Sequence, residues 1–167
     1  MMNMKRYYFY DYDEVTETEH DIRDDNYRKL IDFCCANAKT VSFMFRSADI
    51  FCADWLESFR IDHPAEITCS YYHLGMGKKR EEDLGLRFYA MCPELHRWML
   101  DSAESIFEWL DGWGYKNPEN PIFYRSDGSV LFYSVIHDGE IVLCVRDDED
   151  VSGILSSSPW KTEKRIY

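Results

Sequence analysis

Apolar residues recur at helical spacing in three parts of the chain. The first pattern predicts an amphipathic helix over residues 25–38, and the second predicts a helix over residues 47–59. The longest pattern predicts a helix over residues 93–111, with Pro93 in its first turn and Gly112 at its end. The inward faces are expected to consist of Tyr27, Leu30, Ile31, Cys34 and Ala38 in the first helix, of Phe51, Trp55, Leu56 and Phe59 in the second, and of Leu95, Trp98, Met99, Ser102, Ala103, Ile106, Phe107 and Leu110 in the third.

Shorter apolar runs have the length of β-strands, and turn signals separate the last three of them. Asp127-Gly128 and Asp138-Gly139 each lie between two apolar runs, which is a strong local signal for a hairpin. Residues 121–146 are therefore predicted to form a three-stranded antiparallel meander. The other predicted strands are residues 5–10, 41–46, 67–72 and 85–91.

The strands over residues 130–136 and 140–146 are apolar on both faces, which is typical of strands that are covered on both sides. Together with the helices they predict an α+β or mixed α/β fold. We expect one mixed, largely antiparallel sheet of about four to seven strands and about three packed helices. A chain of 167 residues suits a single domain over residues 1–167. Within it, residues 11–25 are expected to form an acidic loop and residues 156–167 a polar tail.

The chain carries 31 acidic and 19 basic residues, which gives a net charge of −12. Phosphate contacts need a basic surface, so this balance argues against nucleic-acid binding, and it argues equally against docking on anionic lipid. It fits a protein partner of opposite charge. Aromatic residues make up 16% of the chain, which excludes global disorder.

The amino-terminal residues and the cysteines both indicate a cytoplasmic protein. The first ten residues lead directly into an acidic stretch, without an apolar core of signal-peptide length. No run approaches the ~18 apolar residues that span a membrane. The six cysteines include no Cys-x-x-Cys pair, so we expect reduced thiols and no zinc site, other metal or cofactor.

Acidic residues gather in three parts of the chain. Four carboxylates recur at i, i+3, i+7 and i+10 on the predicted helix 93–111, so they share one face. Eight more lie in residues 11–25, and a further group lies in residues 147–150. These segments are either solvated faces and loops or parts of one negative surface that docks a basic partner. The candidate docking carboxylates are Asp101, Glu104, Glu108 and Asp111 on the helix, and Asp147 and Asp148 after the last strand.

Three aromatic residues cluster near the end of the longest predicted helix. They are Trp109, Trp113 and Tyr115. Core packing accounts for such residues in many proteins, but tryptophan and tyrosine are also enriched as anchors in partner interfaces. Trp113 is the candidate for an exposed anchor.

A short motif near the amino terminus offers an enzymatic alternative. Residues 7–13, an apolar run that ends in Asp-x-Asp, resemble the first motif of haloacid-dehalogenase-like phosphatases. The resemblance implies that Asp11 attacks phosphorus, that Asp13 is the general acid–base, and that both help to hold magnesium. It also implies a hydroxyl, a lysine and further metal-binding acids, for which the candidates are Ser47, Lys78 or Lys79, and Asp147, Asp148 and Asp150.

The leading hypothesis is a non-enzymatic acidic protein of the cytoplasm. It would hold a basic protein partner, in the manner of an immunity or inhibitor protein that neutralises a toxin or nuclease. The alternative is a magnesium-dependent phosphatase that uses Asp11 and Asp13. The sequence leaves the partner's identity and the oligomeric state open. The expected partner-binding residues are Asp101, Glu104, Glu108, Asp111, Trp113, Asp147 and Asp148.

Overall fold

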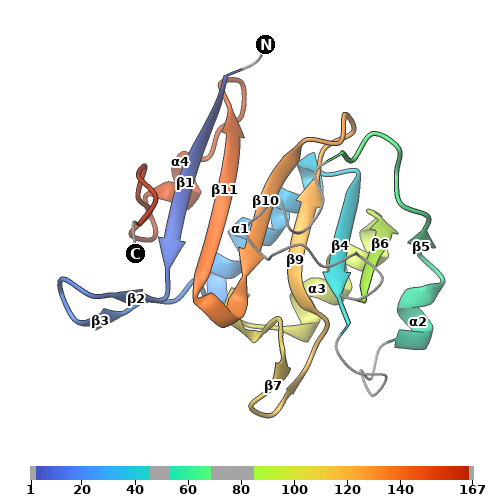
Figure 1. Ribbon diagram of the computed structural model, residues 1–167, viewed down its shortest axis with the longest axis horizontal. Helices are drawn as coiled ribbons and strands as arrows, with labels where there is room; N and C mark the ends of the chain where they lie inside the picture. Colours follow the sequence, from blue (N-terminus) through green and yellow to red (C-terminus); the bar gives the residue numbers. More distant parts are fainter. Residues whose placement is uncertain (1–2, 46–52, 69–84, 166–167) are drawn as a thin grey trace.

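The computed structural model describes residues 3–45, 53–68 and 85–165, and these form a seven-stranded sheet (Figure 1). The strand order is β1-β11-β10-β9-β4-β6-β5, and each neighbouring pair is antiparallel. The fold is therefore mixed α+β and mostly sheet. The strands are β1 (Met4–Tyr10), β4 (Thr40–Met44), β5 (Arg60–Ile61), β6 (Leu86–Ala90), β9 (Glu119–Tyr124), β10 (Val130–Val135) and β11 (Glu140–Arg146).

The turns between β9, β10 and β11 use the Asp-Gly pairs that the sequence pattern singles out. In the first turn Asp127 accepts a hydrogen bond from the backbone N–H of Ser129 (3.1 Å), and Gly128 has a φ of +81°. The second connection is a short 3-10 helix, η4 (Ile136–Asp138), which ends at Gly139 with a φ of +62°. Glycine adopts this left-handed conformation without the strain that a Cβ introduces, so both turns can be tight.

Four α-helices lie in the described part of the chain: α1 (Asp24–Asn37), α2 (Ala53–Glu57), α3 (Pro93–Ser102) and α4 (Ser152–Leu155). In Figure 1 the helices α1 and α3 lie behind the sheet. Four of the five residues predicted for the inward face of α1 are buried in it, namely Tyr27, Leu30, Ile31 and Cys34, whereas Ala38 is the half-buried residue that follows the helix. Asp24 and Asp25 occupy its first turn, where negative charge is favourable. The sequence pattern did not predict α4.

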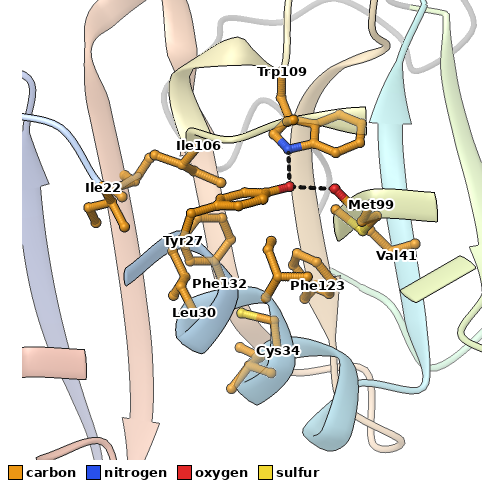
Figure 2. Close-up of a cluster of buried hydrophobic side chains, with 14 of the residues drawn as sticks. Ile22, Tyr27, Leu30, Cys34, Val41, Met99, Ile106, Trp109, Phe123 and Phe132 are labelled. Carbon is orange, nitrogen blue, oxygen red and sulfur yellow. Dashed lines mark hydrogen bonds between the residues drawn. The ribbon is translucent and has the colours of Figure 1, made fainter. Parts of the chain in front are cut away.

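Buried side chains lie on both faces of the sheet, as the apolar pattern of the middle strands predicts. The helix-facing core includes Tyr27 and Trp109, two of its largest fully buried side chains (Figure 2). The Tyr27 hydroxyl accepts a hydrogen bond from the Trp109 indole N–H (3.0 Å) and donates one to the Met99 carbonyl (2.7 Å). On the opposite face the buried cluster is Tyr8, Tyr10, Met44, Ile67, Phe88, Ile122, Tyr124, Tyr133, Val135, Val142 and Cys144.

The helix predicted over residues 93–111 is too long, because α3 ends at Ser102. Ala103 is extended, with φ −151° and ψ 151°, and a 3-10 helix, η3 (Ile106–Glu108), follows. The Tyr27 hydroxyl donates a hydrogen bond to the Met99 carbonyl, the group to which the N–H of Ala103 would donate in a continuing helix. The chain then crosses to the segment before α1, where the N–H of Ile106 donates to the Ile22 carbonyl (3.1 Å). Ala103, Ile106 and Leu110 are still buried, although their backbone is not α-helical.

The second predicted helix and the strand after it agree with the structure only in part. Leu56 is fully buried in α2, but Trp55 is 43% exposed and meets the core only in part, with 5.9 Å between the ring centroids of Trp55 and Trp98. Ile67 is buried outside any strand. The remainder of the predicted strand 67–72 beyond Thr68, and the helix start over residues 47–52, lie outside the described residues.

Two small hairpins extend from the same end of the sheet (Figure 1). One joins β2 (Tyr12–Asp13) to β3 (Thr18–Glu19) within the predicted acidic loop, and the other joins β7 (Asp111–Gly112) to β8 (Tyr115–Lys116). No described helix is long and apolar enough to cross a membrane. Part of the tail pairs with the outer edge of β1, where Tyr8 and Lys161 exchange two backbone hydrogen bonds (2.7 and 2.8 Å). Pairing of this kind shields an edge strand.

Candidate partner-binding site

The acidic segments at residues 11–25 and 147–150 lie at opposite ends of the sheet. In the antiparallel ladder of β1 and β11, Tyr10 is paired with Glu140, and Met4 with Arg146. The two end pairs of this ladder are six steps, or roughly 20 Å, apart, and Asp11 follows one end while Asp147 follows the other. The structure thereby corrects the expectation of one continuous negative surface. Asp147 and Asp148 therefore lie at the end of the sheet opposite to the acidic residues 11–25.

The Asp-x-Asp motif does not meet the other acids of the phosphatase alternative. Asp13 accepts hydrogen bonds from the backbone N–H groups of Val15 (2.9 Å) and Thr16 (3.2 Å), and from Lys161 (2.8 Å). These bonds, with that from Lys161 the strongest, lower the pKa of Asp13 to about 2. Its carboxylate therefore closes its own turn, while Asp147 lies at the far end of an antiparallel sheet.

Asp11 has a different environment from Asp13. Burial raises the pKa of Asp11, and the charge of Arg165 opposes that shift. In residues 3–45, 53–68 and 85–165 no three His, Cys, Asp or Glu side chains are grouped to hold a metal ion. Ser47, Lys78 and Lys79, the remaining candidates of this alternative, lie outside those ranges.

Several carboxylates gather around Arg23, at the end of the sheet where β1 stops. Arg23 lies within 3.7 Å of Asp21, 3.7 Å of Asp24 and 3.8 Å of Glu108. Glu108 also accepts a hydrogen bond from the backbone N–H of Glu104 (2.8 Å). One arginine cannot neutralise this set, so negative charge remains in excess. We call this surface the acidic end. Its carboxylates are Asp11, Glu19, Asp21, Asp24, Glu104 and Glu108, and we include the exposed Asp101, which lies three residues before Glu104.

A hollow of about 430 Å³ opens in the acidic end. Its floor combines aromatic and charged groups, since the ring of Phe107 lies beside carboxylates and a histidine. Phe107 packs on Phe9 of β1, with 6.1 Å between the ring centroids. The lining residues are Asp11, Tyr12, Glu19, His20, Asp21, Arg23 and Phe107.

The four carboxylates predicted to share one helical face are not equivalent. Asp101 is exposed on the last turn of α3, and Glu104 is exposed after the helix has ended. The side chain of Glu108 is only 16% exposed and is paired with Arg23. The side chain of Asp111 is 9% exposed and is paired with Lys116 (3.2 Å). Asp101 and Glu104 are therefore the two of these four that are available to a partner.

Trp113 is the most exposed large apolar side chain in the described part of the chain apart from Val15. It is 85% exposed at the tip of the β7–β8 hairpin, and Tyr115 beside it is 39% exposed. The backbone of Trp113 is left-handed, with a φ of +49°. A bulky residue in this conformation is strained, and such strain tends to occur at functional sites.

The base of this hairpin contains a buried polar group that the sequence patterns do not indicate. Glu119, at the start of β9, is 0% exposed. Its Oε1 atom accepts a hydrogen bond from the backbone N–H of Asp111 (3.1 Å) and lies 3.1 Å from Nε2 of His137. His137 also faces the Trp113 ring, with 6.2 Å between the centroids. Spacing gives no hint of this cluster, and the one local signal is a charged residue between Pro118 and Pro121.

We compared the chain with protein families, curated proteins and solved structures. No protein-family model matches the chain, and the searches of curated proteins and of solved structures returned no significant match.

Proposed function

We propose that this protein binds a basic protein partner at the acidic end, with Trp113 as the apolar anchor of the interface. The observation that carries the proposal is the exposure of Trp113 (85%) on a hairpin whose base is fixed by buried polar contacts. An indole that is this open to water contributes little to the core of the chain. Tryptophan is the residue type most enriched among the side chains that dominate binding energy in protein interfaces.

The charge distribution supports a basic partner. The β2–β3 and β7–β8 hairpins extend from one end of the sheet (Figure 1), and the carboxylates around Arg23 belong to that same end. A surface of one sign attracts a partner of the opposite sign and steers its approach. In this proposal Asp101 and Glu104 supply exposed charge for steering, and Trp113 supplies the buried contact once the partner has docked.

Inhibition is the role we assign to this binding, in the manner of an immunity protein of the cytoplasm. A net charge of −12 resembles that of nucleic acid in sign, so the binding surface of a basic nuclease or toxin is a suitable target. The proposal involves no enzymatic step and no cofactor. Asp147 and Asp148 are left out of the site because they lie at the other end of the sheet.

The test is capture of partners from a lysate of the native host, at low and then at high salt. The bait proteins are the natural chain, Trp113→Ala, and Trp55→Ala as the matched control. Trp55 is also exposed (43%), but it packs on Phe59 in α2, with 4.8 Å between the ring centroids. We expect a basic protein that is captured by the natural chain and by Trp55→Ala, is lost with Trp113→Ala, and is released by salt.

Two results would contradict the proposal. One is capture by Trp113→Ala at the level of the natural chain, because the anchor would then be unnecessary. The other is a captured protein that is acidic and stays bound in high salt. If a basic protein is captured as expected, an activity assay of that protein with and without this chain tests the inhibitory role separately.

A further inference from the structure

The carboxylate of Glu119 lies where the base of the β7–β8 hairpin meets η4. It is fully buried, and a buried carboxylate is tolerated only with hydrogen-bond or charge partners. One oxygen, Oε1, contacts both the N–H of Asp111, which begins the hairpin, and Nε2 of His137 in η4 (3.1 Å each). This buried atom therefore contacts both the hairpin and η4.

Trp113 lies on the outer side of this junction. Its ring faces the ring of His137, with a centroid distance of 6.2 Å and an interplanar angle of 59°. His137 therefore lies between the exposed indole and the buried carboxylate. The hairpin has only two residues in each strand, so its own backbone pairing gives it little stability.

Backbone strain flanks the same contacts. Trp113 and Asn120 both have a positive φ, of +49° and +52°. The left-handed region is unfavourable for a bulky residue such as Trp113, whereas asparagine adopts it more readily. Asn120 is 1% exposed, and its side-chain oxygen accepts a hydrogen bond from the N–H of Ile136 (2.8 Å), the first residue of η4. Strain of this kind persists only where surrounding contacts determine the conformation.

We propose that Glu119 is the positioning residue of the Trp113 anchor, acting through Asp111 and His137. It fixes the hairpin base and the imidazole on which the indole lies, so that Trp113 is already ordered before a partner arrives. A pre-ordered side chain loses less conformational entropy on binding. This inference rests on the proposed function, because it concerns the same anchor. Because Glu119 is fully buried, it would not touch the bound protein directly.

The test is carried out on the full chain alone, without a partner. The readout is ¹⁵N relaxation of the backbone amide of Trp113, assigned by comparison with Trp113→Phe. An order parameter near ~0.85 marks a rigid backbone, and a value below ~0.6 marks a flexible one. We expect the natural chain to give the rigid value, and Glu119→Ala and His137→Ala to give the flexible one. Glu119→Gln should restore the rigid value, because its amide oxygen still accepts from the N–H of Asp111.

Glu149→Ala is the matched control for a loss of stability alone. It removes another carboxylate that accepts hydrogen bonds, from Arg125 (2.6 and 2.7 Å), at the opposite end of β11. We expect a lower melting temperature with the order parameter of Trp113 unchanged. If Glu119→Ala does not fold, His137→Ala decides the question, because His137 is an exposed residue whose side chain is not part of the core.

The outcomes separate this inference from the proposed function. An unchanged order parameter in His137→Ala overturns the inference, and so does an equal loss of order in Glu149→Ala. Either result leaves capture of a basic partner by Trp113 untouched. Conversely, a mobile hairpin in His137→Ala together with full capture by Trp113→Ala supports the positioning role and removes the proposed function.

Discussion

The indole N–H of Trp109 donates a hydrogen bond to the hydroxyl of Tyr27, across 82 residues of sequence (3.0 Å). Figure 2 shows this bond at the centre of the helix-facing core, together with the bond from Tyr27 to Met99. The same hydroxyl thus ends α3 and holds the segment that leads to the β7–β8 hairpin. The hydrogen bond in the core therefore also helps to position the candidate partner-binding site.

Tyr27→Phe should lower the free energy of unfolding by about 1–3 kcal/mol, because it leaves a buried indole N–H and a carbonyl without their partner. Urea denaturation measures this difference. Tyr115→Phe is the control, since it removes a hydroxyl from a partly exposed ring (39%) and should change the stability by less than ~0.5 kcal/mol. Equal stabilities of Tyr27→Phe and the natural chain would contradict this role of the bond.

The pair formed by Arg125 and Glu149 predicts a dependence of stability on pH. Burial opposes ionisation of Glu149, but hydrogen bonds from Arg125 (2.6 Å) and from the backbone N–H of Arg146 (2.8 Å), with the charges of both arginines, outweigh it. The net effect lowers the pKa of Glu149 from its ordinary 4.5. A carboxyl whose pKa is lower in the folded state stabilises the fold above its unfolded pKa, and this contribution is lost as the pH falls through the folded pKa.

The measurement is the difference in unfolding free energy between the natural chain and Glu149→Gln at several pH values. It should be constant near neutral pH. It should shrink as the pH falls from about 4.5, where the carboxyl of the unfolded chain protonates, through the lower pKa of the folded state. Asp148→Asn, at an exposed neighbour, is the control and should show a smaller change. A difference that grows toward acid pH would contradict the assignment.

Gly128→Ala should destabilise the chain, because Gly128 has a φ of +81° and a Cβ there would overlap the backbone carbonyl of Glu66. The expected loss exceeds about 1 kcal/mol. Gly153→Ala in α4 meets no atom within 4 Å and should instead stabilise the chain by about 0.4–1 kcal/mol. Thermal unfolding of the two variants distinguishes them by the sign of the shift.

The sequence pattern predicted those parts of the fold that depend on residues close together in the chain, such as helix faces and tight turns. The spacing of Tyr27, Leu30, Ile31 and Cys34 is enough to define the buried face of α1, because neighbouring turns of a helix present the same side. The Asp-Gly pairs located the turns between the last strands for a similar reason. Neither kind of pattern carries information on strand order, so the pairing of β4 with β9 was not foreseen.

The segment after Ser102 shows where periodicity fails. Ala103 and Ile106 fit a helical face, yet they are equally buried on an extended and 3-10 backbone, since the decisive contact is the distant Tyr27 hydroxyl. The acidic end and the hairpin base were not predicted for the same reason, because both depend on contacts between distant residues. Arg23 meets Glu108, and Glu119 meets His137, only after the chain has folded. The sequence identified Trp113 and Glu104 as candidates but not the residues that position them.

Trp113→Ala should speed dissociation of a captured partner about 30-fold or more, because truncating an aromatic anchor removes contacts that form only after docking. Its association rate should change little. Stopped-flow or surface-plasmon kinetics separate the two rates, with Trp55→Ala as the control. A slower association with unchanged dissociation would show that Trp113 does not act as an anchor.

The most direct test of the central claim, that the acidic end steers a basic partner, is the association rate constant of two charge-reversed variants at low salt and in half-molar salt. Asp101→Lys/Glu104→Lys and Asp147→Lys/Asp148→Lys change the net charge equally, and all four residues are exposed, but the second pair follows β11 at the other end of the sheet. Steering depends on the local field, which salt screens beyond roughly 8 Å at physiological ionic strength. At low salt we expect the first variant to associate about tenfold or more slowly than the natural chain and the second to be much less affected, and we expect half-molar salt to abolish the differences. Equal rates for the two variants, or a rate that does not depend on salt, would contradict it.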